Sequence, residues 1–124
     1  MTSAPIDELM RKAADAPFSR EDIDTACLDL NLAVGELFDA ISRRIVEGYT
    51  SGELSFSFCD TVMNHVYSFQ RLVHDMVSDY SYSVFQAFDE GEYQHPDDPA
   101  DSSPEDLYTK PMIAEIAANH AKVI

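Results

Sequence analysis

A run of carboxylates carries the clearest chemistry in this sequence. Positions 89–106 read DEGEYQHPDDPADSSPED, with eight acidic side chains and no Lys or Arg. Ionised groups lose much free energy when they leave water unpaired, so we expect this segment to face solvent. Its three prolines restrict the backbone and make it partly rigid. The acidic side chains are Asp89, Glu90, Glu92, Asp97, Asp98, Asp101, Glu105 and Asp106.

An anionic surface of this kind suits a positively charged partner. The formal net charge is −15 and the sequence pI is about 4.3, which argues against nucleic acid and membrane lipid as partners. A basic protein is the natural complement. Tyr93 and Tyr108 lie near the two ends of the segment that we name the acidic loop, residues 91–108. These rings either join the eight carboxylates in contacting the partner, because Tyr is favoured at interfaces, or hold the loop against the body of the protein.

The sequence offers little for a metal ion or another cofactor, and we predict neither. Glu92 and His95 form a single Glu-x-x-His pair beside a glycine and a proline, which supplies too few ligands for a closed or catalytic site. The acidic loop lacks the central glycine and fixed offsets of an EF-hand calcium loop. His65 and His74 are nine residues apart on one predicted helix, so they point to opposite sides and cannot share a metal.

Nothing in the chain has the pattern of a catalytic site, and we predict that the protein is not an enzyme. It has neither a glycine-rich phosphate loop nor a nucleophile elbow. Cys27 lies in a predicted apolar stripe, and Cys59 has no neighbouring cation to stabilise a thiolate. We expect two buried free thiols in a reducing compartment, although a disulfide between them stays open. An enzyme with a carboxylate or metal site is retained only as a third class of function.

Helical periodicity dominates the rest of the chain. Residues 5–14 form a first short helix, with acidic residues near its start and basic residues near its end. From Ile23 to Ile45 apolar residues recur every three or four positions, which predicts one long helix capped by Ser19 and ending at Gly48. The apolar sector of this helix is wide enough to pack against more than one neighbour.

A second long apolar stripe starts at Leu54 and runs to Tyr80. Poor helix formers at 78–83 predict a kink or break there, and Gly91 takes the position of the glycine that follows a helix. After the acidic loop, Thr109 is predicted to cap the last helix.

These elements predict an all-α fold, a small antiparallel bundle of about four to five helices with the long acidic, proline-containing loop before the last helix. We expect the 124 residues to form one domain, in which residues 1–18 are an N-terminal arm with a short helix. With 45% apolar residues the chain can build a core, so it is not a disordered acidic tail. No apolar signal segment and no membrane-spanning window is found, so we expect a bacterial cytoplasmic protein.

One stretch of the sequence resembles a known kind of protein. Residues 45–116 combine the turn EGYTSG before an aromatic-rich helix, the segment VFQAFDEGEY, and the segment YTKP before the last helix. In these features the chain resembles small helical bacterial immunity proteins of the colicin D inhibitor type. The resemblance implies a compact, helical, acidic protein that neutralises a basic nuclease toxin by covering its active site. It carries over no individual toxin-contacting residue.

Two classes of function remain. The first, which we favour, is an acidic protein that captures a basic protein partner, most concretely an immunity-type inhibitor of a bacterial nuclease toxin. Its predicted contact surface is the eight carboxylates together with Tyr93 and Tyr108. The alternative is a helical homo-oligomeric assembly module, in which the stripes 23–45 and 54–80 pair across a dimer axis and the charge serves solubility alone.

Overall fold

The protein is helical throughout the part that the structure describes. A computed structural model describes residues 3–73 and 78–123, which contain six α-helices, one π-helical turn and no strand. The all-α prediction is therefore confirmed, with more helices than the four to five expected. The elements are α1 (Ser3–Asp15), α2 (Arg20–Leu30), α3 (Val34–Ser51), α4 (Phe56–Val73), α5 (Asp79–Glu90), the π turn η1 (Glu105–Thr109) and α6 (Lys110–Val123).

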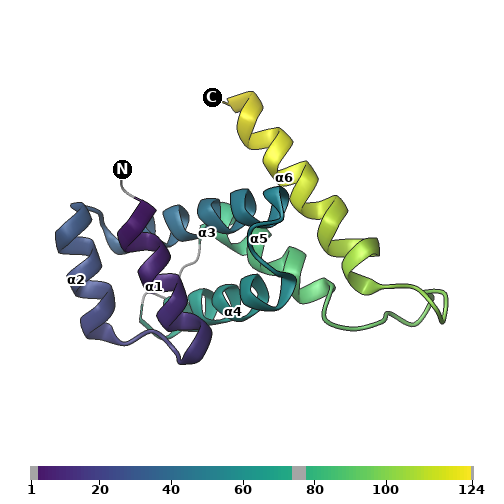
Figure 1. Cartoon of the computed structure of the whole chain (residues 1–124), viewed down its shortest axis with the longest axis horizontal. Helices are drawn as coiled ribbons and strands as arrows, with labels where there is room; N and C mark the ends of the chain where they lie inside the picture. The colour runs from purple at the N-terminus through teal and green to yellow at the C-terminus, as the bar shows by residue number, and fades with distance from the viewer. Residues whose placement is uncertain (1–2, 74–77, 124) are drawn as a thin grey trace.

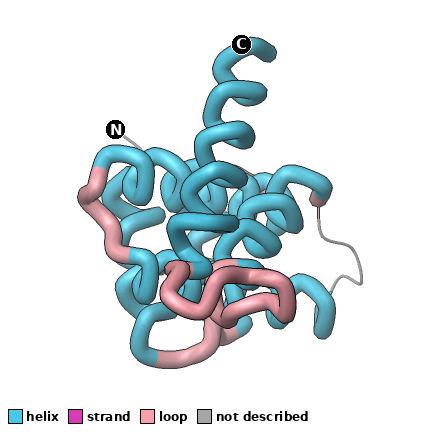
Figure 2. The backbone as a smooth tube through the Cα atoms, turned by 90° about the vertical axis from the view of Figure 1, so that its right-hand side faces the viewer, coloured by secondary structure: helices cyan, strands magenta, loops and turns pink. Residues whose placement is uncertain are grey.

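The helices pack around a central group formed by α3, α4 and α5. Helices α1 and α2 lie at one end of the molecule, and α6 lies at the other end together with the acidic loop (Figure 1). Helix α1 contacts α3 and α4, whereas α6 contacts α3, α5 and η1. The C-terminal half of α6 extends beyond the other helices (Figures 1 and 2). The acidic loop and the helix pair α1–α2 are therefore far apart.

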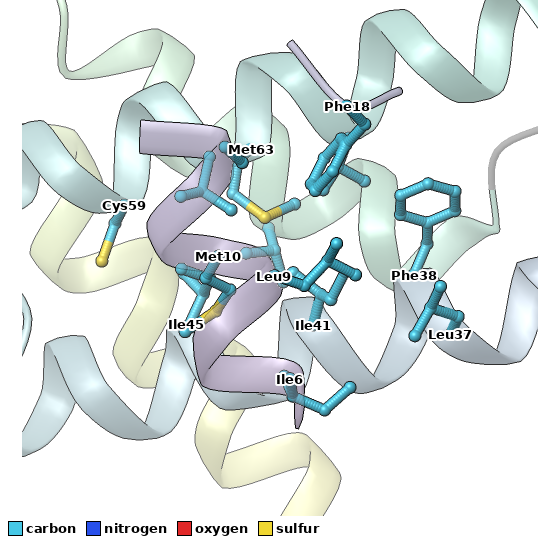
Figure 3. Close-up of a cluster of buried hydrophobic side chains, with 14 of the residues drawn as sticks. Ile6, Leu9, Met10, Phe18, Leu37, Phe38, Ile41, Ile45, Cys59 and Met63 are labelled. Atoms are coloured by element: carbon cyan, nitrogen blue, oxygen red, sulfur yellow. The ribbon is translucent and has the colours of Figure 1, made fainter. Parts of the chain in front are cut away.

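Helix α3 supplies the centre of the core. Figure 3 shows its side chains gathered with those of α1 and α4. The short helix predicted within the N-terminal arm, residues 1–18, is α1, and its buried apolar face is part of the core. The buried apolar residues are Leu37, Phe38, Ile41, Ile45 and Val46 of α3, Ile6, Leu9, Met10 and Ala13 of α1, Phe18, Ile23 and Ala26 near and in α2, Cys59, Val62, Met63 and Val66 of α4, Val84, Ala87 and Phe88 of α5, and Ile113 of α6.

The predicted long helix 23–45 is wrong, because the chain breaks between α2 and α3. Asn31 takes a left-handed conformation with φ of 56°, which Asn tolerates better than most residues. The N–H of Leu32 then donates to the carbonyl oxygen of Cys27 at 3.0 Å. The Glu36 side chain accepts the Ala33 N–H at 2.9 Å and starts α3. The apolar spacing continues across the break, so periodicity gave no sign of it.

Helix α3 also ends later than predicted. It continues through Gly48 to Ser51, and Gly52 ends it with φ of 83°, a conformation that favours glycine. Gly48 has a packing role, since a Cβ atom there would lie 2.3 Å from Leu54 Cδ1. The first glycine therefore lets the turn after α3 fold back on the helix, and the second ends the helix.

The kink or break predicted at 78–83 is present at Ser78, which has an extended backbone and directly precedes α5. Residues 79–83 are helical, and Ser78 caps α5 by accepting the Ser81 N–H at 3.0 Å. Serine is a poor residue inside a helix but a favoured one at its start. Ser81 itself is buried, and its hydroxyl lies 3.0 Å from Asp39 Oδ1 of α3. His74, which figured in the prediction of metal ligands, lies outside the described residues.

Candidate protein-binding surface

The acidic loop has a defined shape that its own side chains maintain. It leaves α5 and returns to η1 at the end of the molecule facing the viewer in Figure 2. Gln94 Nε2 lies 3.0 to 3.1 Å from the carbonyl oxygens of Pro99, Ala100 and Ser102. The Ser102 hydroxyl donates to the Pro99 carbonyl oxygen at 2.6 Å. The Gln94 side chain thereby holds residues 99–102 of the loop against the segment that contains Gln94.

Three rings stack where the two ends of the loop meet. The His95 ring is 4.4 Å from the Tyr93 ring and 4.2 Å from the Tyr108 ring, measured between centroids. His95 Nε2 also lies 3.1 Å from the carbonyl oxygen of Glu90 at the end of α5. Tyr93 is 50% exposed, whereas Tyr108 is half-buried. Tyr108 therefore holds the loop in place, and Tyr93 presents an aromatic face to solvent.

Asp98 connects these ends through two hydrogen bonds. Its carboxylate accepts the Tyr108 hydroxyl at 2.5 Å and the His95 backbone N–H at 2.9 Å. The Tyr108 bond, helped by the His95 bond, lowers the pKa of Asp98, and the same contact raises the pKa of Tyr108 to about 12. Asp98 thus has a structural role in the loop, although it was predicted as a partner contact.

The variant Tyr108→Phe tests this bond, because it removes the hydroxyl and keeps the ring beside His95. We expect amide hydrogen exchange at His95 to accelerate about fivefold and the pKa of Asp98 to rise toward its ordinary value. NMR measures both. Tyr93→Phe is the matched control, since the Tyr93 hydroxyl makes no hydrogen bond with the described residues. Equal exchange rates in the wild type and Tyr108→Phe would contradict the assigned role of Asp98.

The predicted contact carboxylates fall into two groups. Five of them bond to another described residue: Glu90 to His95, Glu92 to Asn64, Asp98 to Tyr108, Glu105 to Tyr49 and Asp106 to Lys110. Within the same described residues, Asp89, Asp97 and Asp101 make no hydrogen bond or ion pair. Asp97 and Asp101 are exposed, and Asp89 is half-buried. None of the eight residues is buried, although five of them are paired within the protein.

The arginines of α3 do not neutralise the acidic loop. Arg44 Nε lies 2.9 Å from Asp7 Oδ1, and Arg44 Nη2 lies 2.9 Å from Glu53 Oε2. Arg43 lies over the Tyr80 ring, with 5.9 Å between its Cζ and the ring centroid. Arg44 thus links α3 to α1 and to the turn after α3, and Arg43 contacts α5. The negative charge of Asp97 and Asp101 is left available at the surface.

Asp60 of α4 belongs to this end of the molecule, and sequence reasoning missed it. Burial raises the pKa of Asp60 to about 8, and a hydrogen bond with Glu92 adds to the shift. Asn64, one turn further along α4, donates to Glu92 Oε2 at 3.2 Å. Asp60 therefore keeps its proton to a higher pH than an ordinary carboxyl group, beside Glu92 where the loop leaves α5. No local pattern shows this pairing, because it depends on how the loop returns to α4.

Asp60→Asn tests the raised pKa of Asp60. Since the folded protein holds a proton that the unfolded chain releases near pH 4, wild-type stability should fall as the pH rises from about 4 to about 8. The amide keeps a hydrogen-bond donor toward Glu92 without a charge, so we expect the variant to be more stable than the wild type at pH 9 and similar at pH 4. Allowing for solvent screening, the difference at pH 9 is about 1–2 kcal/mol.

Urea unfolding at both pH values measures this difference. Asp29→Asn is the control, because Asp29 is exposed on α2, and its effect should not depend on pH. Parallel pH profiles for the wild type and Asp60→Asn would contradict a raised pKa of Asp60 in the folded protein.

The cysteines and histidines do not form a catalytic arrangement in the described residues. Cys27 and Cys59 are both free, so the disulfide that the sequence left open is absent; Cys59 is buried, whereas Cys27 is half-buried and not buried as expected. Burial raises the pKa of Cys59 to about 12. Burial and the nearby Asp24 carboxylate raise the pKa of Cys27. His65 Nδ1 lies 2.8 Å from the carbonyl oxygen of Ala13, which ties it to α1. The described part of the chain contains no group of three or more His, Cys, Asp or Glu residues that could hold a metal ion.

Comparisons with protein-family models, with curated proteins and with solved structures found no match to this chain. Among the helices in residues 3–73 and 78–123, none has the length and apolar character needed to cross a membrane.

Proposed function

We propose that this protein captures a basic protein partner on the acidic loop. The observation that carries the proposal is a loop whose shape is maintained by internal bonds while Asp97, Asp101 and one face of Tyr93 remain at its surface. The bonds of Gln94 and Asp98 act within the loop and leave these three side chains outside. The site is thus an anionic surface with an exposed aromatic ring.

The internal bonds favour binding because they reduce the freedom that the loop would lose on docking. A binding segment that is already ordered loses less conformational entropy than a flexible one. The formal charge of −15 also accelerates encounter with a cationic protein, and this effect weakens as salt screens the charges. A basic partner is therefore expected to bind quickly and to depend strongly on ionic strength.

The most concrete partner is a bacterial nuclease toxin. A nuclease needs a cationic cleft to hold phosphates, and a protein that blocks this cleft can do so with carboxylates. The resemblance of residues 45–116 to immunity proteins of the colicin D inhibitor type supports this choice. The α-helical fold, with a charged loop at one end, is compatible with such an inhibitor.

The alternative of a helical assembly module loses its main argument. Leu37, Ile41, Ile45, Val62 and Val66, which belong to the two apolar stripes, are fully buried within one chain. They are therefore not available to pair across a dimer axis. Analytical ultracentrifugation gives the test, since the assembly module requires association over the micromolar range, whereas the inhibitor can be a monomer.

The binding proposal is tested by capture followed by reconstitution. The tagged protein is incubated with lysate of its source cells at about 50 mM salt, and retained proteins are identified by mass spectrometry. The double variant Asp97→Asn/Asp101→Asn serves as the loop variant. The control is Glu21→Gln/Asp29→Asn, which removes two exposed charges on α2 at the opposite end of the molecule.

We expect a basic protein that is retained by the wild type and by the α2 control but is lost from the loop variant. The purified pair should then form a complex, and one equivalent of this protein should suppress the nuclease activity of its partner. Retention of the same partner by the loop variant would contradict the proposed surface. A reconstituted pair with undiminished nuclease activity would contradict the inhibitor role.

A further inference from the structure

A pocket of about 440 Å³ opens next to the acidic loop. It lies between the turn after α3, the start of α4, and the junction of η1 with α6. Leu54, Phe56 and Ile113 give it apolar walls, and Glu105 and Lys110 contribute its charged groups. Glu105 is also one of the eight carboxylates of the acidic run, so the pocket and the acidic loop share this residue.

The position of the Glu105 carboxylate in this pocket is fixed by Tyr49. The Tyr49 hydroxyl donates to Glu105 Oε2 at 2.5 Å, and the Tyr49 ring packs edge-on against Phe88 with 5.2 Å between centroids. Burial and the contact with Glu105 raise the pKa of Tyr49, so the hydroxyl keeps its proton and remains a donor. The hydroxyl thus orients the carboxylate without removing its charge.

Lys110 does not neutralise Glu105. Its ammonium group pairs with Asp106, with 2.7 Å between Nζ and Oδ1. Lys110 also lines the pocket and lies near Glu105, but because its ion pair is with Asp106, the Glu105 carboxylate has no ion-pair partner of its own among the described residues. Three kinds of occupant can be compared on this basis: an anion, a neutral apolar group and a cation with an apolar stem.

An anion is disfavoured by Glu105 and by the net charge of the protein. A neutral apolar group would take water away from Glu105 and replace it with nothing that donates a hydrogen bond. An arginine side chain satisfies both parts of the pocket, because its aliphatic stem covers apolar surface and its planar guanidinium pairs with a carboxylate. Arginine is also a frequent anchor residue in protein interfaces.

We propose that this pocket receives an arginine side chain of the basic partner, with the aliphatic stem against Leu54 and Ile113 and the guanidinium on Glu105. This inference rests on the proposed function and adds an anchor point to it. The acidic loop gives long-range attraction, and the pocket gives a short-range contact that selects an arginine. The partner should therefore present an exposed arginine beside its loop-binding face.

The test uses N-acetyl-arginine-N-methylamide as a probe of the isolated pocket. NMR titration should give saturable shifts at residues lining the pocket, with a dissociation constant on the order of 1 mM for a probe of this size. The corresponding citrulline compound has the same shape without the charge and should bind at least tenfold more weakly. Equal binding of the two probes, or shifts that map elsewhere, would overturn the inference.

Two variants check the contacts that the probe should make. Glu105→Gln keeps an acceptor for Tyr49 but removes the charge, and it should weaken arginine-probe binding about tenfold. Ala114→Trp fills the pocket from α6 and should abolish binding. The control Thr25→Trp places the same ring on the exposed surface of α2 and should leave binding unchanged. A probe that binds Ala114→Trp as tightly as the wild type is not in this pocket.

The reconstituted complex separates a failure of this inference from a failure of the proposed function. If both hold, the partner binds less tightly to Ala114→Trp and to the loop variant. If the partner is lost only from the loop variant, the surface stands and the arginine pocket is refuted. If the arginine probe binds the pocket but neither variant changes partner capture, the proposed use of both sites in partner binding is refuted.

Discussion

The double charge reversal Asp97→Lys/Asp101→Lys should weaken binding of the basic partner about 100-fold or more. Both side chains are exposed and make no hydrogen bond or ion pair with the described residues, so the change should leave the loop structure intact. Placing like charges opposite one another costs several kcal/mol at an interface. Most of the loss should appear in the association rate at low salt, because the steering field is reversed at the point of contact.

Stopped-flow or surface-based kinetics at several salt concentrations measures this effect. The wild type should associate more slowly as salt rises, and the reversed variant should show a flat or inverted dependence. Glu21→Lys/Asp29→Lys on α2 is the matched control, since it gives the same net charge at the opposite end of the molecule. Similar losses in both double variants would mean that net charge matters and the loop does not.

The largest expected effect on stability is that of Gly91→Ala at the start of the acidic loop. A Cβ atom there would lie 2.0 Å from Thr109 Oγ1 and 3.1 Å from Phe56 Cε1. The Thr109 hydroxyl is buried and donates to the carbonyl oxygen of Ala87 at 2.7 Å, so it cannot move aside without losing that bond. We expect a loss of about 2–4 kcal/mol and a fall in Tm of about 8–15 °C.

The control for this variant is Gly35→Ala, because a Cβ atom at Gly35 meets nothing within 4 Å. Alanine there should be neutral or stabilise α3 by up to about 1 kcal/mol. The double variant Gly91→Ala/Thr109→Ala should lose less stability than the sum of the two single changes, since the second removes the clashing oxygen. Equal stability of Gly91→Ala and the wild type would contradict the close packing of the loop start against η1.

Gly91 and Thr109 show how far the sequence could predict this fold. Gly91 was predicted to be the glycine that follows the helix, and it does follow α5, but its φ is −84° and its role is to admit Thr109. Thr109 was predicted to cap the last helix, but it is buried in the contact with α5. In both cases the sequence singled out the residue, but the role of that residue depends on a contact with a neighbour that is distant in sequence.

Local periodicity was the reliable signal. The apolar face of α4 and the cap at Ser19 follow from spacing and residue type, and both are present. The break at Asn31 could not be found in this way, because the three- and four-residue steps continue on either side of it. A left-handed Asn is a weak local preference that the packing of α2 against α1 and α3 decides.

The candidate surface was predictable in composition and not in arrangement. The excess of carboxylates and the two tyrosines are visible in the sequence. Which of these side chains maintain the loop and which are left for a partner depends on tertiary contacts. Asp98 and Tyr108 maintain the loop, and Asp97, Asp101 and Tyr93 are left for a partner. Asp60 joins the same region from α4 and carries no sequence signal of this role.

The measurement that tests the central claim most directly is the hydrogen-exchange footprint of the reconstituted complex. The account predicts that the basic partner slows amide exchange across residues 89–110 and leaves α1 and α2 unchanged. Protection confined to α1 and α2, with the acidic loop exchanging as fast as in the free protein, would contradict the claim that this loop is the binding surface.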